Sequence, residues 1–247
     1  MNWRNPNEKH ELVRLEMGDI ENPINVPHFY GQHAEDLVVF GLLKARFQQQ
    51  RFRDWSYLDI GANHPVHCSN TYLFYRCGAS GVAVEPNREM AQLFKKHRPR
   101  DRVIIAGAKF DERDTAKFRI TENNLLSTFS LEFIDSWKRV NGSGAKIISS
   151  EDIALVDIND LVQENFLEKN RKLHLLNIDV EGYDLQVLKR IDFRIAQPEV
   201  IVVEYIVPGQ PELSKEFCEI LESNNYILIY RGRLNLIFLR NRGEDKI

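Results

Sequence analysis

The feature that most constrains the fold of this chain is a short apolar segment that ends beside an acid and is followed at once by a glycine. Residues 57–63 read Tyr-Leu-Asp-Ile-Gly-Ala-Asn, and Asp59 lies near the end of the apolar run. Gly61 allows a tight backbone turn that a side chain would obstruct, so we expect main-chain N–H groups there to face a ligand. A strand, a glycine turn and a helix in this order predict an α/β fold with its ligand at the carboxyl end of the first strand.

Strand and helix signals alternate along most of the chain. Continuous apolar segments such as residues 103–105 and 200–203 are typical of strands buried on both faces of a parallel sheet. The last two predicted strands, Tyr226–Tyr230 and Leu234–Leu239, have so short a link that they must form an antiparallel pair. The other strands are expected at Trp55–Ile60, Gly81–Glu85, Val103–Ala106, Ile153–Ile158, Leu173–Asp179 and Val200–Tyr205, and helices at Ala34–Phe47, 70–77, Arg88–His97, Asn159–Phe166, Asp184–Ile191 and Pro211–Glu222.

This order predicts an α/β, Rossmann-like fold of the class I methyltransferase arrangement. Such a fold has a seven-stranded, mostly parallel sheet, an antiparallel C-terminal hairpin and helices on both faces. Residues 1–30 are polar and contain three prolines, so we expect an N-terminal extension there and the main domain over residues 31–247. The alternation is interrupted over about residues 112–150, which predicts an inserted region over one edge of the ligand site.

Composition excludes several classes of function. The net charge is −3, from 33 Lys and Arg against 36 Asp and Glu, which argues against a nucleic-acid partner. The basic residues between Lys95 and Arg102 are interpreted as the solvated end of a helix. Three cysteines without metal-ligand spacing indicate thiols in a reducing compartment. No signal peptide or membrane-spanning apolar run is recognised, so we expect a cytoplasmic protein.

The turn after the first strand indicates which ligand fits. A dinucleotide fingerprint needs three glycines, and only Gly61 is present. Glu85 ends the second strand about 20 residues later, where an acid can accept both ribose hydroxyls. Asp59, Gly61, Asn63 and Glu85 therefore predict an adenosine ligand without phosphates, for which S-adenosylmethionine is the obvious candidate.

A second group of acids follows two neighbouring strands. Asp179 ends the apolar strand that begins at Leu173, Glu181 comes two residues later, and Glu204 ends the next strand. Acids are costly to bury unless they bind something. They suggest a general base for a substrate hydroxyl, with Asp179 first and Glu181 second, or ligands for a hard divalent cation formed by Asp179, Glu181 and Glu204. Glu204 is also a candidate substrate contact, and Asp184 is interpreted as a helix cap.

Three further residues are candidates because of their position. His64 lies just past the glycine turn, where a base would reach a ligand, although a lone histidine is more often structural. Ser127 and Thr128 lie in the inserted region and are candidates for hydrogen bonds to the substrate or the cofactor.

Several segments together identify a family. They are Tyr57–Asn63, Ser69-Asn70-Thr71, Gly81–Asn87, Leu126–Phe129 and Leu176–Gly182, preceded by Gln32–Asp36. In these segments, which spread over most of the chain, the sequence resembles the FkbM-type S-adenosylmethionine-dependent methyltransferases. Many members have a small residue where this chain has Pro65. We expect cofactor contacts at Asp59, Gly61, Ala62, Asn63, Asn70, Glu85, Pro86, Asn87 and Ala108.

The resemblance implies methyl transfer to a hydroxyl oxygen, often on a sugar of a glycan or on a secondary metabolite. We therefore expect an O-methyltransferase whose partner is a small-molecule or glycan acceptor, with S-adenosylmethionine as cofactor and a divalent metal as an alternative to a general base. A homo-oligomer is compatible with the sequence. The alternatives are a non-catalytic binding domain, a dinucleotide-dependent oxidoreductase, which lacks its glycines here, and an RNA methyltransferase, which the acidic balance disfavours.

Overall fold

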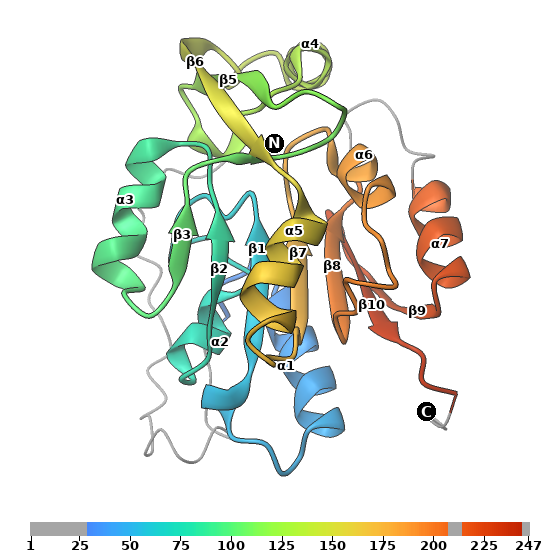
Figure 1. Cartoon of the computed structure of the whole chain (residues 1–247). Helices are drawn as coiled ribbons and strands as arrows, with labels where there is room; N and C mark the ends of the chain where they lie inside the picture. The colour runs from blue at the N-terminus through green and yellow to red at the C-terminus, as the bar shows by residue number, and fades with distance from the viewer. Residues whose placement is uncertain (1–28, 207–213, 244–247) are drawn as a thin grey trace.

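A seven-stranded sheet runs through the computed structural model, which describes residues 29–206 and 214–243 (Figure 1). The strand order is β3-β2-β1-β7-β8-β10-β9, and β10 is antiparallel to both of its neighbours while the other pairs are parallel. The strands are β1 Ser56–Ile60, β2 Ser80–Val84, β3 Arg102–Ile104, β7 Leu175–Ile178, β8 Val200–Glu204, β9 Tyr226–Arg231 and β10 Asn235–Arg240. This topology confirms the predicted fold class.

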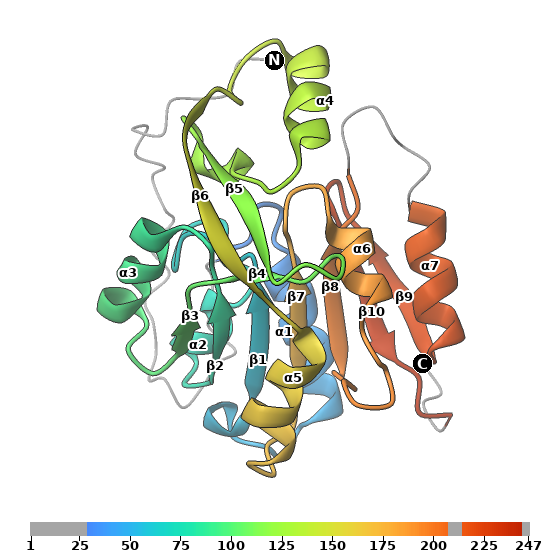
Figure 2. The same cartoon turned by 45° about the horizontal axis from the view of Figure 1, so that its top comes forward.

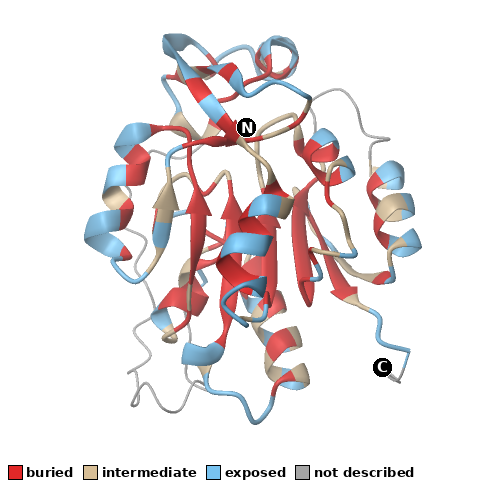
Figure 3. Cartoon of the chain, in the orientation of Figure 1, coloured by how far each residue is buried: buried red, intermediate tan, exposed pale blue. Residues whose placement is uncertain are grey.

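Helices cover both faces of the sheet because its central strands are apolar on both sides. Val200 and Val202 of β8 pack in the cluster that includes α1 and α2, while Ile201 and Val203 pack with α5, α6 and α7. All five residues of β8 are buried, and the outward helix surfaces are exposed (Figure 3). The helices are α1 Glu35–Arg46, α2 Tyr72–Arg76, α3 Arg88–His97, α5 Ile158–Val162, α6 Asp184–Lys189 and α7 Ser214–Ser223, with a short π-helical turn at Gln163–Leu167 after α5.

One predicted strand lies outside the main sheet. The segment expected at Ile153–Ile158 is the end of a longer strand, β6 Ile147–Val156, which pairs with β5 Thr115–Thr121 and with β4 Gly107–Ala108. Between β5 and β6 the chain forms a 3-10 turn at Asn124–Leu126 and helix α4 Leu131–Asn141. The first six residues of β6 are exposed, as expected of a strand that projects beyond the core.

The excursion from β5 to β6 stands over the carboxyl ends of the parallel strands (Figure 2). It forms a roof over the edge of the sheet where the candidate residues gather. Helix α4 begins at a side-chain cap, in which Ser130 accepts the Phe133 N–H, and it ends at Gly142, which has a positive φ of 76°. The excursion runs from Thr115 to Val156 and overlaps the region of about residues 112–150 in which the sequence shows no alternation of strands and helices.

Two predicted segments, the N-terminal extension and the helix Pro211–Glu222, extend beyond the residues that the structure describes. Residues 1–28 and Pro211 lie outside the described residues. Within the described ranges, none of the helices has the length and apolar character needed to cross a membrane. Two acids in the first turn of α1, Glu35 and Asp36, are fully buried. Asp36 accepts the Tyr30 N–H, and Glu35 accepts a hydrogen bond from Asn235 of β10.

Candidate functional site

A cavity of about 880 Å³, open solvent at its mouth included, lies at the carboxyl ends of β1, β2 and β7 beneath the excursion; we call it the first cavity. Most predicted site residues line it, although they are spread over more than 120 positions of the chain. Those that do are Asp59, Gly61, Ala62, Asn63, Asn70, Glu85, Pro86, Asn87, Ala108, Ser127, Asp179 and Glu181. His64, Thr128 and Glu204 are not part of this lining.

The turn after β1 depends on a glycine for a reason that the sequence does not reveal. Gly61 has a φ of +77°, and a Cβ on it would lie 1.7 Å from the Asp179 carbonyl oxygen. The expectation that N–H groups of this turn face a ligand is wrong for Gly61 and Ala62, because both donate to the Val84 carbonyl oxygen. The glycine therefore brings the ends of β1 and β7 together.

Glu85 is held rigidly at the end of β2. Its two carboxylate oxygens accept the main-chain N–H groups of Asn63 and Asn87, each at 2.6 Å. A carboxylate has about four lone-pair sites, so acceptor capacity is left for ligand hydroxyls. Burial raises the pKa of Glu85 to about 7, although the two N–H donors oppose this shift. The side chain thus joins two loops and faces the first cavity.

Asp59 lies at the base of the cavity with its hydrogen bonds already made. It accepts the Thr71 hydroxyl and, at 2.9 Å, the Asn177 side-chain amide. Asn177 in turn accepts a hydrogen bond from Asn70 at 3.0 Å, whereas the buried Asn70 Oδ1 has no partner among the described residues. Asn70 is therefore the member of this chain of contacts that still offers an acceptor.

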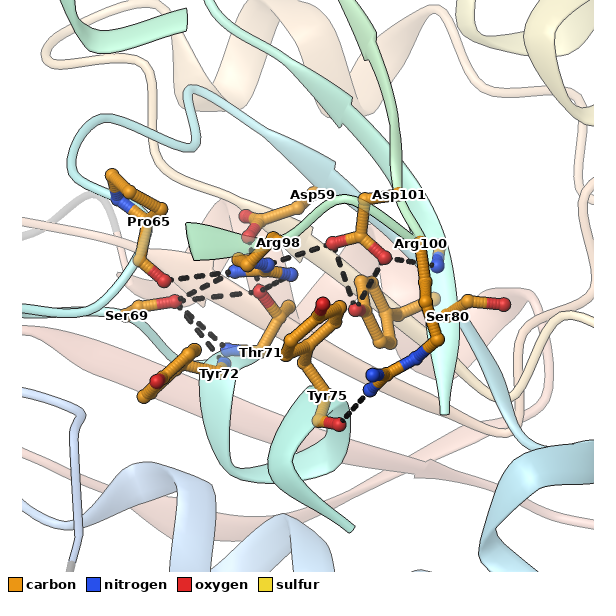
Figure 4. A network of polar contacts seen from close by, with 12 residues as sticks. Asp59, Pro65, Ser69, Thr71, Tyr72, Tyr75, Ser80, Arg98, Arg100 and Asp101 are labelled. Carbon is orange, nitrogen blue, oxygen red and sulfur yellow. Dashed lines mark hydrogen bonds and ion pairs between the residues drawn. The ribbon is translucent and has the colours of Figure 1, made fainter. Parts of the chain in front are cut away.

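A buried arginine holds the loop between β1 and α2 (Figure 4). Arg98 is fully buried and forms an ion pair with Asp101 at 2.7 Å, which corrects the interpretation of this basic run as entirely solvated. The guanidinium also donates to Thr71 at 3.0 Å and to the Pro65 carbonyl at 3.4 Å. Through Thr71 the arginine supports Asp59, so α3 helps to position the floor of the cavity.

Three acids meet where β7 and β8 end. Carboxylate oxygens of Asp179, Glu181 and Glu204 lie within 4.8 Å of one another, and we call these residues the acidic cluster. Burial and repulsion from Asp184 and Asp59 raise the pKa of Asp179 to about 8. Burial and repulsion from neighbouring acids also raise the pKa values of Glu181 and Glu204 well above the usual range. Such a cluster is stable when it shares protons or binds a cation.

The backbone of the acidic cluster is strained. Glu181 has a φ of +54°, a conformation that costs a residue with a side chain of its size about 1–3 kcal/mol. Thr128 holds this conformation, because its buried hydroxyl donates to the Glu181 carbonyl oxygen at 2.6 Å. Thr128 was expected to contact substrate or cofactor, and the structure instead gives it a positioning role. Asp184 accepts the N–H groups of Val180 and Gly182, which precede α6. Its interpretation as a helix cap is therefore wrong, because no side chain caps the start of α6.

His64 is turned toward other histidines. Its Nδ1 accepts the N–H groups of Val66 and His67, and its ring lies 4.6 Å from His67 and 6.5 Å from His97 between centroids. Burial, with help from these neighbours, lowers the pKa of His64. Because the ring is absent from the lining of the first cavity, the structure does not support a catalytic role for His64.

Sequence reasoning missed part of the cavity wall. Phe110 lies in an irregular segment and stacks on Tyr183, with 4.0 Å between ring centroids. Asn124 and Leu125 come from the roof, where Asn124 accepts a hydrogen bond from Asn63 at 3.0 Å. The polar residues 122–124 were the only sequence signal for this contact, and the sequence around them does not indicate that they fold over the end of the first strand.

The charged side chains that line the first cavity are all acidic among the described residues. Four acids line the first cavity, and none of its described lining residues is a lysine, arginine or histidine. They are Asp59, Glu85, Asp179 and Glu181. Such a cavity suits a ligand with positive charge and hydroxyl groups, and it offers no side-chain cation to a phosphate.

The profile of one family, described as the methyltransferase FkbM domain, matches residues 59–228, which is more than half of the chain. The chain belongs to the FkbM methyltransferase family. The matched region begins at Asp59 and includes Glu85 and all three members of the acidic cluster. It confirms the resemblance that the sequence motifs indicate, and the protein is a methyltransferase.

Solved structures with a similar fold include other methyltransferases. Methyltransferase FkbM from Methylobacillus flagellatus KT is 16% identical with a TM-score of 0.45, covering 78% of this chain and 46% of that chain. A TehB-like SAM-dependent methyltransferase from Corynebacterium glutamicum ATCC 13032 Kitasato is 12% identical with a TM-score of 0.39, covering 85% and 89%. Monomeric WbdD is 10% identical with a TM-score of 0.45, covering 84% and 40%. A search of curated protein sequences gives no match.

Proposed function

We propose that this FkbM family member is an S-adenosylmethionine-dependent O-methyltransferase that acts on a hydroxyl of a sugar, a glycan or a related small molecule. The observation that carries the proposal is the first cavity, which has four acids and no described basic side chain in its lining. S-adenosylmethionine has a sulfonium and an ammonium group and no phosphate. NAD and ATP bring phosphates, for which the described residues of this lining provide no side-chain cation.

The residues present fit the adenosyl part of that cofactor. Glu85 would accept the ribose hydroxyls, since each of its oxygens has only one main-chain donor in the structure. Asn70 would offer its unpartnered Oδ1 to a donor on the ligand. Pro86, Asn87 and Ala108 would line the remaining contact surface.

When bound, S-adenosylmethionine supplies an activated methyl group, whose carbon joins the acceptor oxygen while the sulfur keeps the electron pair of the broken bond. The chain's own task is to orient the acceptor hydroxyl and to take its proton. Asp179 is our first choice for the proton acceptor and Glu181 the second, because both face the first cavity. Alternatively, Asp179, Glu181 and Glu204 would hold a hard divalent cation that lowers the pKa of the hydroxyl.

Calorimetry with three ligands tests the cofactor. We expect S-adenosylmethionine and S-adenosylhomocysteine to bind and NAD to give no heat of binding. Binding of NAD alone would overturn the proposal in favour of the oxidoreductase alternative. Comparison of activity with and without a chelator then decides between the general base and the cation.

A methyl-acceptor screen, monitored by release of S-adenosylhomocysteine, tests the reaction. The Asp179→Asn variant should keep the wild-type unfolding transition and bind S-adenosylhomocysteine, but it should lose turnover. Full turnover in this variant would exclude Asp179 as the base.

A further inference from the structure

Two buried side chains near the ends of β8 and β10 have oxygen atoms that receive no hydrogen bond. They are Oε2 of Glu204 and Oδ1 of Asn235, neither of which has a partner among the described residues. Glu204 is 9% exposed and Asn235 is 4% exposed, and both oxygen atoms are closed to solvent. Because a buried oxygen without a donor or a cation is costly, these two atoms favour a common ligand.

The two oxygen atoms belong to residues that lie directly opposite each other. Asn235 of β10 pairs with Glu204 of β8 in antiparallel register. Beside them the Tyr205 N–H donates to the Leu234 carbonyl oxygen, so Asn235 and Glu204 form a non-hydrogen-bonded pair. The side chains of such a pair point to one face of the sheet, with Cβ atoms about 5 Å apart. Asn235 therefore lies beside the acidic cluster.

Helix α1 fixes the orientation of the Asn235 amide. The Asn235 Nδ2 atom donates to Oε1 of Glu35 at 3.1 Å. A carboxylate accepts hydrogen bonds and donates none, so the amide nitrogen, not the oxygen, faces Glu35. Glu35 is fully buried and is held in turn, since its Oε2 atom accepts the His33 N–H at 2.8 Å. Asn235 thus presents its oxygen to its other neighbours, of which Glu204 is one.

The negative charge around the acidic cluster favours a cation as the common ligand. The charged groups that act on its three carboxyl groups include Asp59, Asp184 and Glu35, all of which are acids. A single proton can bridge only two of the oxygen atoms. A divalent cation takes about six or more oxygen ligands, so it can contact Asn235 and all three acids of the cluster at once.

The ligand atoms determine the class of ion. Three carboxylates and one amide carbonyl form an all-oxygen set, which suits Mg²⁺, Ca²⁺ and Mn²⁺ rather than metals that prefer nitrogen or sulfur. Mg²⁺ usually keeps several water molecules, so a buried set of protein ligands favours Ca²⁺ or Mn²⁺. Asp179 and Glu181 also line the first cavity, so an ion that they hold would face the ligand site.

We propose that Asn235 completes a site for one divalent cation, Ca²⁺ or Mn²⁺, in which its Oδ1 atom joins carboxylate oxygens of Asp179, Glu181 and Glu204. Glu35 is the positioning residue of this site, because it holds the Asn235 amide. The role of the ion in catalysis rests on the proposed function, of which this inference selects the alternative with a cation.

Electron paramagnetic resonance of free Mn²⁺ tests the site without turnover. The full chain is first freed of metal with a chelator and is then titrated with Mn²⁺. We expect a single tightly bound Mn²⁺ per chain and an unfolding midpoint that rises when Mn²⁺ is present. Absence of Mn²⁺ binding would overturn the proposal and would favour protons shared between the buried oxygen atoms.

Substitution of Asn235 tests the fourth ligand. Asn235→Leu removes the oxygen, keeps a side chain of similar size and should weaken Mn²⁺ binding at least about tenfold. Asn165→Leu is the matched control at another buried asparagine, which is 2% exposed and lies on the turn after α5. It should bind Mn²⁺ as wild type does. Unchanged affinity in Asn235→Leu, or an equal loss in the control, would refute Asn235 as a ligand.

Asn235→Asp distinguishes a ligand from a merely structural residue, and it decides the question even where the leucine variant does not fold. The aspartate keeps an oxygen ligand and adds a negative charge, so it should bind Mn²⁺ at least as tightly as wild type. If Asn235 served only to pair with Glu35, the aspartate would weaken Mn²⁺ binding, because it offers Glu35 no donor and repels it. Weaker binding in Asn235→Asp would therefore overturn the proposal.

Calorimetry of S-adenosylhomocysteine on the wild-type chain separates the two proposals. Absence of this binding would contradict the proposed function. Normal binding of S-adenosylhomocysteine without binding of Mn²⁺ would contradict the cation site alone and leave Asp179 as the general base.

Discussion

Replacing Thr128 with valine removes one hydroxyl and keeps the shape of the side chain. That hydroxyl donates to the Glu181 carbonyl at 2.6 Å and accepts the Ser130 N–H at 2.9 Å. Thr128 is fully buried, so water does not replace the lost partners. At about 1 kcal/mol for each hydrogen bond, with an added cost for unsatisfied buried groups, we expect a loss of about 2–3 kcal/mol in the free energy of unfolding.

The same substitution should lower turnover. Glu181 is held at a φ of +54°, and without the Thr128 hydroxyl its backbone can relax toward a less strained conformation. Since a displacement of about 1 Å can cost about 100-fold in rate, we expect kcat to fall at least about tenfold. Affinity for S-adenosylhomocysteine should stay within twofold, because the contacts of Glu85 are unchanged.

Thr128→Ser is the matched control, since it keeps the hydroxyl and loses only a buried methyl group. It should cost about 1 kcal/mol in stability and leave kcat near wild type. Urea unfolding and methyl-transfer kinetics measure both effects. Equal losses of kcat in the serine and valine variants would refute the positioning role, and a raised KM with unchanged kcat in the valine variant would instead restore Thr128 as a substrate contact.

Three further predictions concern binding, stability and pH. Glu85→Gln should weaken S-adenosylhomocysteine about tenfold or more by calorimetry, because hydroxyl groups bind a carboxylate more strongly than an amide. Since burial raises the pKa of Glu85 to about 7, wild-type affinity should rise from pH 6 to pH 8 more steeply than the affinity of the variant, in which only the other acids of the cavity titrate. Arg98→Met should lower the free energy of unfolding by about 3–5 kcal/mol because it leaves Asp101 buried without its cation, and Asp101→Asn in the same chain should recover part of the loss; an unchanged urea midpoint would contradict this. Burial, with repulsion from Lys172, lowers the pKa of His174 to about 4, so the unfolded chain binds a proton that the folded chain does not, and stability should fall by up to about 3 kcal/mol from pH 6.5 to pH 4. If His174→Gln shows the same dependence on pH, the histidine is not the cause.

Much of the main sheet follows from local sequence. The apolar runs at β1, β7 and β8 have few alternatives to a doubly buried strand, and the link between β9 and β10 is too short for a parallel crossover. Residues that follow parallel strands, such as Glu85 after β2 and Asp179 after β7, lie at the same edge of the sheet whatever the order of the strands. Their convergence was therefore predictable without knowing the contacts.

For the excursion over the site, the sequence predicted only that the alternation of strands and helices is interrupted. The sequence indicates that alternation stops at about residue 112, but β6 pairs with β5 and β4 rather than with the main sheet. Strand pairing between distant segments is a tertiary choice, because the same apolar pattern suits either sheet. The contact from Asn63 to Asn124 depends on that choice.

Residues that are neighbours in one sequence motif have different surroundings in the structure, and only tertiary packing decides which. Ser127 lines the first cavity, whereas Thr128 points away from it to hold Glu181. Arg98 belongs to a run of basic residues that reads as solvated, yet it is fully buried because Asp101 and Thr71 face it. Charge composition predicts that the basic residues of such a run are exposed to solvent, and it does not identify the one residue that has buried partners.

The sequence by itself therefore determined the fold class, the family and the strand ends at which ligands are bound, because these depend on periodicity, turn residues and short motifs. The tertiary structure decided which side chains face the first cavity, that the Gly61 turn leaves no room for a Cβ beside the Asp179 carbonyl, and that the three acids of the acidic cluster lie within 4.8 Å of one another. Those facts depend on distances of a few ångströms between segments far apart in the chain. Such distances follow from how the layers pack and not from any local pattern.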